Sequence, residues 1–139
     1  MTVERLLLRD ETPKREGARA PKPDAAGETR VERAFFCARC ATRLADATRL
    51  FSPLGGACRF VFANPAGRIF EIVTITEAEN VLALGEPMLE YSWFPGFAWS
   101  MLLCAGCSTH LGWRFDAVGA GGASFVAFIT SAVVEGGGE

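Results

Sequence analysis

The sequence predicts an all-β domain, and two features of the chain indicate this class. Its apolar residues fall in short runs rich in β-branched and aromatic residues, and turns containing Pro or Gly separate these runs. The length of 139 residues favours one domain, and a chain that is 50% apolar has enough hydrophobic residues for a core. A core of this size is modest, so a structural metal would stabilise it noticeably.

The N-terminal region differs from the rest of the chain. Residues 9–30 mix both charges with Pro, Gly and Ala and contain no large apolar residue. Such a segment buries too little surface to offset the entropy of ordering, so residues 1–30 are predicted to be a flexible tail. The folded domain is then expected to cover residues 31–135, and the Gly-rich residues 136–139 are expected to form a loose C-terminus.

The clearest strand signal is a hairpin in the middle of the chain. Residues 59–63 and 69–75 read as strands, and residues 64–67 (NPAG) between them have Pro and Gly at positions that suit a type I turn. Thr76 and Glu79 then have the spacing of a capping box, which predicts one short helical turn. Further strands are predicted at residues 81–84, 99–103, 112–115 and 125–134.

Four of the five cysteines occur as two C-x-x-C pairs. Cys37 and Cys40 form the first pair, and Cys104 and Cys107 form the second, far along the chain. Two such pairs complete a tetrahedral shell of four thiolates, with Zn–S distances of about 2.3 Å, which is the usual structural zinc site. A filled shell leaves no position for water, so the sequence predicts one structural Zn²⁺ per chain that clamps two distant hairpins. The alternatives are redox dithiols or unrelated core cysteines.

Two further residues lie near this pattern. Cys58 is a lone thiol, and we interpret it as a small packed residue with no assigned role. His110 is the only histidine and follows Cys107 by three positions. We expect it to make a structural hydrogen bond near the zinc, with a role as fourth ligand as the alternative.

All three tryptophans fall within residues 91–115. Trp93 and Trp99 flank Pro95-Gly96, a pair that favours a tight turn and would place both rings on two walls of one pocket. Trp113, on a predicted strand after the second C-x-x-C pair, would supply a third wall. The alternative is a hydrophobic core built from large aromatic residues.

Charge and hydropathy exclude several classes of partner. The formal net charge of −2 argues against nucleic acid or an anionic membrane as the main partner. No apolar run reaches the roughly 20 residues that a membrane helix needs. The apolar run near the N-terminus is only three leucines long and has acidic neighbours, so no secretory signal is predicted and the expected compartment is the cytosol, where thiols stay reduced.

The aromatic and cysteine segments together resemble a known family. The pattern S-W-F-P-G-x-A-W followed by C-x-x-C-x-x-H-L-G-W-x-F resembles the thalidomide-binding (CULT) domain of cereblon, and it fixes many positions. The N-P-x-G turn at residues 64–67 and the first cysteine pair match as well, and residues 125–132 are similar to the closing strand of the family. The resemblance covers about residues 33–134 and is greatest to single-domain bacterial members.

The resemblance implies a β-tent, in which two antiparallel sheets lie roughly at right angles and a structural zinc pins them. It also implies a non-catalytic domain that binds cyclic imides or uracil-like rings, such as glutarimide and thalidomide-type ligands, in a cage of three tryptophans. The residue matching Phe115 lies at the base, and the backbone of residues 91–93 reads the imide edge. The implied ligand-binding residues are Asn64, Pro65, Phe70, Tyr91, Ser92, Trp93, Trp99, Trp113 and Phe115.

Two positions depart from the eukaryotic pattern, since Tyr91 and Phe70 stand where the human protein has histidine. Only the backbone is needed at Tyr91, so ring recognition should survive, while the preference for exposed substituents should change. A cyclised peptide C-terminus is a further candidate ligand. The large N-terminal region through which eukaryotic cereblon joins a ubiquitin ligase has no counterpart in this sequence, so no ubiquitin-ligase partner is expected.

Three other functions fit parts of the sequence. The second cysteine motif also resembles methionine sulfoxide reductase B, but that enzyme needs a late nucleophilic cysteine, and Thr130 and Ser131 occupy the comparable strand here. Three tryptophans can also hold a quaternary ammonium through cation–π attraction, with Glu86 and Glu90 assisting. A purely structural zinc module would bind neither kind of ligand.

Overall fold

The computed structural model describes residues 33–119 and 122–137. Contacts divide the chain into two units, residues 1–31 and 32–139, and the structure below is that of the second unit. The predicted tail at residues 1–30 and the final residues 138–139 lie outside the described residues. No helix within the described ranges is long and apolar enough to cross a membrane.

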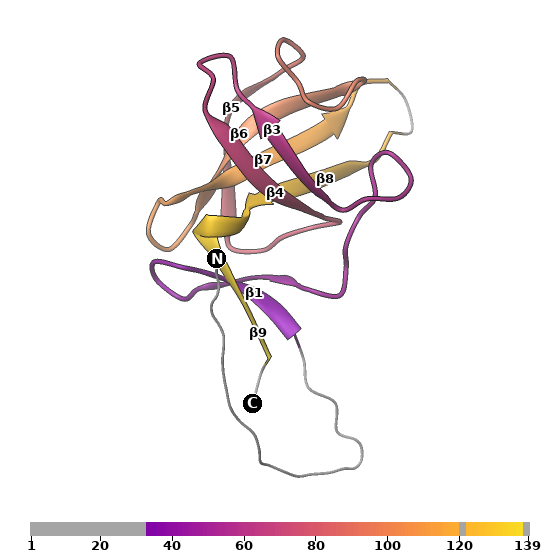
Figure 1. Cartoon of the computed structure of the whole chain (residues 1–139). Helices are drawn as coiled ribbons and strands as arrows, with labels where there is room; N and C mark the ends of the chain where they lie inside the picture. The colour runs from indigo at the N-terminus through magenta and orange to yellow at the C-terminus, as the bar shows by residue number, and fades with distance from the viewer. Residues whose placement is uncertain (1–32, 120–121, 138–139) are drawn as a thin grey trace. The chain divides into compact units, whose positions relative to one another are not determined.

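The described residues form nine strands and one short 3₁₀ helix, η1 (Figure 1). The strands are β1 (Arg33–Cys37), β2 (Arg43–Asp46), β3 (Arg59–Ala63), β4 (Ile69–Ile75), β5 (Val81–Met88), β6 (Phe97–Cys104), β7 (His110–Ala117), β8 (Ser124–Ile129) and β9 (Val133–Gly137), and η1 is Thr130–Ala132. They make a three-stranded sheet, ordered β2-β1-β9, and a six-stranded sheet, ordered β3-β4-β8-β7-β6-β5. All pairs are antiparallel, which confirms the predicted all-β class with two antiparallel sheets.

The predicted central hairpin is present with the expected strand bounds. β3 and β4 pair from Arg59 opposite Val73 to Ala63 opposite Ile69. The Gly67 amide donates to the Asn64 carbonyl over 2.8 Å, so the four-residue turn closes as its sequence indicates. The hairpin therefore fixes the Asn64 turn at one end of the large sheet.

Two local predictions are wrong. No helical turn forms after β4, because Glu79 is used elsewhere: its amide donates to the Leu44 carbonyl over 2.7 Å, and its carboxylate pairs with Arg43 at 2.7 Å. The single strand predicted at residues 125–134 is two strands, β8 in the large sheet and β9 in the small sheet, separated by η1. The chain changes sheets at η1 because β9 finds its partner in β1.

The end of β9 corrects a third expectation. Gly136 and Gly137, expected in a loose C-terminus, pair with Ala34 and Arg33 of β1. The Arg33 guanidinium also contacts the Glu135 carboxylate at 2.9 Å, which supports the same register. Backbone pairing along β1 thus orders residues that have no side chains to pack.

The large sheet has a hydrophobic cluster on each face. Side chains that alternate along its strands pack on one face with the small sheet, and these include Phe35 and Leu44 from the small sheet with Ile75 and Phe128 from the large one. The opposite face carries an aromatic cluster: Phe70, Phe94, Trp113, Phe115 and Phe125. The two-residue period of a strand explains this division, because neighbouring residues point to opposite faces.

Gly112 allows β7 and β8 to approach closely beside this aromatic cluster. Its φ is +151°, and a Cβ at this position would lie 1.8 Å from the Ala127 carbonyl oxygen. We expect Gly112→Ala to lower the free energy of unfolding by about 3 kcal/mol, because backbone has to move to relieve the overlap. Urea denaturation would measure this change.

Gly56→Ala is the matched control. A Cβ at Gly56 meets nothing within 4 Å, and the φ of Gly56 lies outside the left-handed range that disfavours a side chain. It should change the free energy of unfolding by no more than about 0.5 kcal/mol. Equal stabilities of the two variants would show that β7 and β8 separate at little cost.

Candidate functional site

The four paired cysteines converge in space. Their Sγ atoms all lie within 4.8 Å of one another. Cys37 Sγ lies 3.6 Å from Cys107 Sγ, and Cys40 Sγ lies 3.6 Å from Cys104 Sγ. A tetrahedral zinc with Zn–S distances of about 2.3 Å requires sulfurs about 3.8 Å apart, so the cluster fits this ion. His110 is not a member of the cluster, and four sulfurs already fill a tetrahedral shell.

The two cysteine turns have the same local design, C-x-x-C-x-T. In the first, the Cys37 amide donates to the Thr42 carbonyl over 2.8 Å; in the second, the Cys104 amide donates to the Thr109 carbonyl over 2.9 Å. The residue after each second cysteine has a φ of +67°. The turns follow β1 of the small sheet and β6 of the large sheet, so one ion bound to both would join the two sheets.

Threonine hydroxyls favour ionisation of two of the thiols. The Thr42 hydroxyl lies 3.1 Å from Cys40 Sγ and lowers the pKa of Cys40 to about 6, and the Thr109 hydroxyl likewise lowers the pKa of Cys107. Burial raises the pKa of Cys104 to about 11. A divalent cation offsets that burial by stabilising the thiolate directly, so the donor set suits a metal ion.

A pocket of about 510 Å³ opens on the aromatic face of the large sheet. Trp93, Trp99 and Trp113 line it together, so the structure brings the three predicted walls to one place. Eight of the nine predicted ligand-binding residues line this pocket: Asn64, Pro65, Phe70, Tyr91, Trp93, Trp99, Trp113 and Phe115. Ser92 does not, because its hydroxyl turns to the backbone of Phe94, lying 3.1 Å from the carbonyl and 3.3 Å from the amide.

The indole rings are held in fixed orientations. Trp93 donates its indole N–H to the Ala63 carbonyl over 3.0 Å, and Trp99 donates to the Glu90 carbonyl over 2.7 Å. Trp93 and Trp113 meet edge to face, with ring centroids 4.8 Å apart and planes at 74°. The pairing of β6 with β7 places Trp99 opposite Phe115, which is 1% exposed. Two of the three indole N–H groups are therefore already satisfied by backbone carbonyls.

The segment before the pocket turn carries free backbone groups. Tyr91 has a φ of +67°, and the following Ser92 amide donates to the Leu89 carbonyl over 3.1 Å. Within the described part of the chain, neither the Tyr91 carbonyl nor the Trp93 amide has a hydrogen-bond partner. The turn then closes with the Phe97 amide donating to the Phe94 carbonyl over 3.0 Å, and Gly96 takes a φ of +86° as the Pro-Gly pair predicts.

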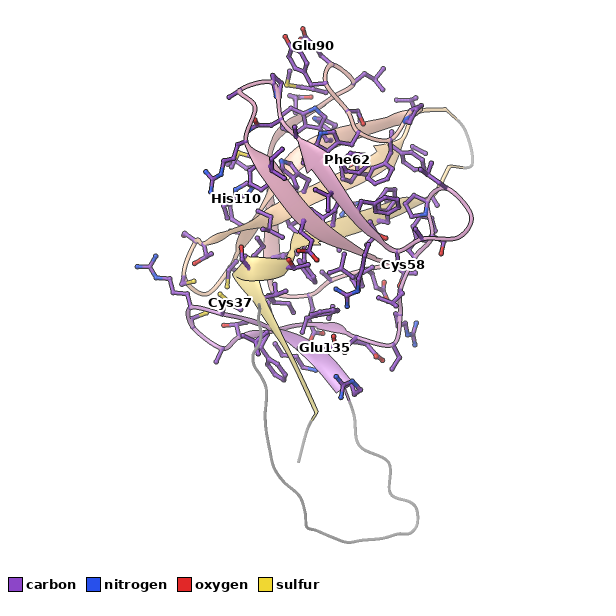
Figure 2. The ribbon with its side chains drawn as sticks, viewed as in Figure 1. Cys37, Cys58, Phe62, Glu90, His110 and Glu135 are labelled. Carbon is purple, nitrogen blue, oxygen red and sulfur yellow. The ribbon has the colours of Figure 1, made fainter. Side chains whose placement is uncertain are left out.

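Four lining residues were not predicted: Arg68, Met88, Met101 and His110. His110 makes a structural hydrogen-bond contact as expected, with the Gly112 carbonyl at 3.0 Å, and it also packs edge to face on Trp113 at 5.0 Å. In the view of Figure 2, His110 lies between Cys37 and Glu90. Strand alternation would have found Met101 from Trp99, because the two residues are two positions apart on β6.

Cys58, and the two residues that stand where a reductase would have its nucleophilic cysteine, lie outside this pocket. Cys58 is half-buried, with Sγ 3.2 Å from the Ser52 hydroxyl, and it is not among the lining residues. Thr130 and Ser131 belong to η1, not to a strand as expected, and do not line the pocket. Among the described residues that line the pocket there is no cysteine.

Comparison with known proteins gives one matching family and several similar relatives. The Yippee-Mis18 family, described as Yippee zinc-binding/DNA-binding/Mis18, centromere assembly, matches residues 33–127. The protein cereblon of Danio rerio is 36% identical over 83 residues, which are 59% of this chain and 19% of that protein. Cereblon of Drosophila melanogaster is 37% identical over 89 residues, 63% of this chain and 15% of the relative.

Cereblon of Xenopus tropicalis is 46% identical over 57 residues, 41% of this chain and 13% of the relative. The chain thus spans at most about a fifth of the length of these curated relatives. The family's zinc-binding description agrees with the geometry of the cysteine cluster. The four cysteines form a site for one zinc ion, and four protein ligands make that site structural.

Proposed function

This chain belongs to the Yippee-Mis18 family and carries a cereblon-like domain, and from this premise we propose that it binds cyclic imides and uracil-like rings without catalysis. Candidate ligands include glutarimide, thalidomide-type compounds and a cyclised peptide C-terminus. One observation carries the proposal: three indoles line a single pocket together with Tyr91, and within the described residues the Tyr91 carbonyl and the Trp93 amide have no hydrogen-bond partner. The zinc has no part in ligand binding and stabilises the fold.

Apolar burial supports the proposal quantitatively. A six-membered imide ring has apolar faces that need no polar partner, and indole faces cover such a surface well. Burying about 150 Å² of ligand surface at roughly 25 cal/mol/Å² contributes about 4 kcal/mol before the costs of association. Because such a small ligand gains little more, we expect micromolar affinity.

The backbone of residues 91–93 would read the polar edge of the ring. In this proposal the Tyr91 carbonyl accepts the imide N–H, and the Trp93 amide donates to a ring carbonyl. Each hydrogen bond contributes only about 1 kcal/mol, but an unmade bond in a buried site costs about 1–3 kcal/mol. The Pro-Gly turn keeps both groups in place before the ligand arrives, which lowers the entropic cost of binding.

Substitution of the imide nitrogen is the sharpest test of this reading. We expect N-methylglutarimide to bind at least about tenfold more weakly than glutarimide, because the methyl group removes the donor and leaves the Tyr91 carbonyl buried and unpaired. Isothermal titration calorimetry with the two compounds would measure the difference. A glutarimide substituted at carbon 3 is the matched control for added bulk, and equal binding of the N-methyl compound would contradict the proposal.

Two of the alternatives gain no support from the pocket. A quaternary ammonium would benefit from a nearby carboxylate, but Glu86 and Glu90 are not lining residues, and Arg68 brings positive charge instead. A thiol-dependent reductase would need a cysteine beside the bound substrate, and the described lining has none. Titration with trimethyllysine beside glutarimide separates the cation cage from the imide site, and a purely structural zinc module would respond to neither.

A further inference from the structure

The pocket lining carries a positive charge and no negative one among the described residues. Arg68 is the charged lining residue, and within the described lining there is no aspartate or glutamate. It lies just after the Asn64 turn, and its amide donates to Asn64 Oδ1 over 2.8 Å, which fixes the backbone from which the side chain extends. A cation held at the mouth of an otherwise apolar pocket has a direct effect on which ligands the pocket prefers.

The Arg68 guanidinium lies on an aromatic wall of the pocket. Its central carbon is 5.0 Å from the centroid of the Phe70 ring. Phe70 in turn packs edge to face on Trp113, with ring centroids 5.0 Å apart. This chain of contacts connects Arg68 to the three tryptophans, and the face of Phe70 keeps the guanidinium beside the site through cation–π attraction.

Arg68 has no carboxylate within ion-pair distance among the described residues. Five other arginines of the described chain do have such a partner: Arg33, Arg43, Arg49, Arg59 and Arg114. Arg39 is the remaining described arginine that lacks one, and it does not line the pocket. The guanidinium at the pocket therefore keeps its five donors for a ligand.

The charge of Arg68 also affects a second residue of the pocket lining, His110. His110, which packs edge to face on Trp113, has its pKa lowered first by burial and further by the charge of Arg68. The two residues come from different segments of the chain, since His110 begins β7 and Arg68 immediately precedes β4. The charge of Arg68 thus acts on another residue of the same pocket lining.

We infer that the pocket prefers an imide or uracil-type ring that carries a carboxylate, with the ring between the indoles and the carboxylate on Arg68. This inference rests on the proposed function and adds the chemical class of the ring's substituent. A guanidinium pairs with a carboxylate through two parallel hydrogen bonds, and no other side chain of the described lining offers this geometry. Arg68 is then a specificity-determining residue, while the indoles and the backbone edge supply ring recognition.

The test compares ligands of the same shape and different charge. Uracil-5-carboxylate and uracil-6-carboxylate are each titrated beside the corresponding neutral carboxamide at pH 7.5, with uracil and glutarimide as parent rings. Wild-type protein is expected to bind one of the carboxylates roughly threefold to fivefold more tightly than its carboxamide at low salt, as for a single charge pair at an exposed site. Added salt should reduce this preference.

The variants separate Arg68 from overall charge. Arg68→Gln should abolish the preference for the carboxylate while leaving the affinity for uracil and glutarimide within about twofold. Arg49→Gln removes the same charge away from the pocket, where Arg49 lies 3.9 Å from Asp46, and should retain the preference.

Two results would overturn the inference and leave the proposed function intact: the parent rings bind but the carboxylates bind no better than the carboxamides, or Arg68→Gln keeps the preference. Failure of every ring to bind the wild-type protein would instead overturn the proposed function, and this inference with it.

Discussion

Replacing Cys104 by serine is expected to unfold the second unit of the chain. Cys104 is 0% exposed, it belongs to the hydrophobic cluster between the two sheets, and its sulfur is one of the four zinc ligands. Binding of a structural zinc contributes about 10–16 kcal/mol in zinc-finger peptides, which matches or exceeds the net stability of most domains, about 5–15 kcal/mol. A serine hydroxyl is a poor zinc ligand and would also be buried without a suitable partner.

Zinc content and circular dichroism measure the outcome together. Wild-type protein should contain one zinc per chain and melt cooperatively, and a strong chelator should abolish that transition. Cys58→Ser is the matched control, because Cys58 lies outside the cluster, and it should keep both the zinc and the transition. A Cys104→Ser protein that melts cooperatively without metal would show that the sheets hold together unaided.

Replacing Trp99 by alanine is expected to remove most of the imide affinity while the protein stays folded. Trp99 lines the pocket and is only half-buried, so its loss should cost the fold less than loss of Trp113, which is 9% exposed and packs against several rings. Losing one aromatic wall should cost about 2–3 kcal/mol of binding free energy, which corresponds to a dissociation constant roughly 30- to 150-fold larger. Calorimetry with glutarimide would measure it.

Two further variants make this result specific. Trp99→Phe keeps a wall but loses the hydrogen bond to the Glu90 carbonyl, so its affinity should be intermediate. Phe36→Ala removes a ring from β1, in the small sheet, and should bind glutarimide as the wild type does. Unchanged affinity of Trp99→Ala would mean that the three indoles do not act as one cage.

The features predicted from the sequence are those that local patterns determine. The β3–β4 hairpin follows from β-branched runs around an N-P-x-G turn, and the two cysteine turns follow from their spacing. The change of sheet at Thr130–Ala132 could not be predicted, because residues 125–134 form one continuous β-like run. The break depends on β1, a partner almost a hundred residues earlier in the chain.

The candidate site divides in the same way. The three tryptophans and the Pro-Gly turn are close in sequence, so their convergence could be predicted. His110 enters the pocket because a register shift between β6 and β7 follows the Leu102–Gly112 pair and places Leu103 opposite His110, and sequence does not display such a shift. Arg68 was overlooked for a different reason: an arginine in a turn is usually solvated, and only its position over Phe70 gives it a role.

The convergence of all three tryptophans on one pocket has a practical consequence. No other tryptophan exists in the chain, so its indole fluorescence comes entirely from the walls of the candidate site. A ligand that displaces water from these rings would change the whole emission signal, with no background from a distant indole. Intrinsic tryptophan fluorescence can therefore report ligand binding, and a library of ring compounds can be screened in solution without attaching a dye.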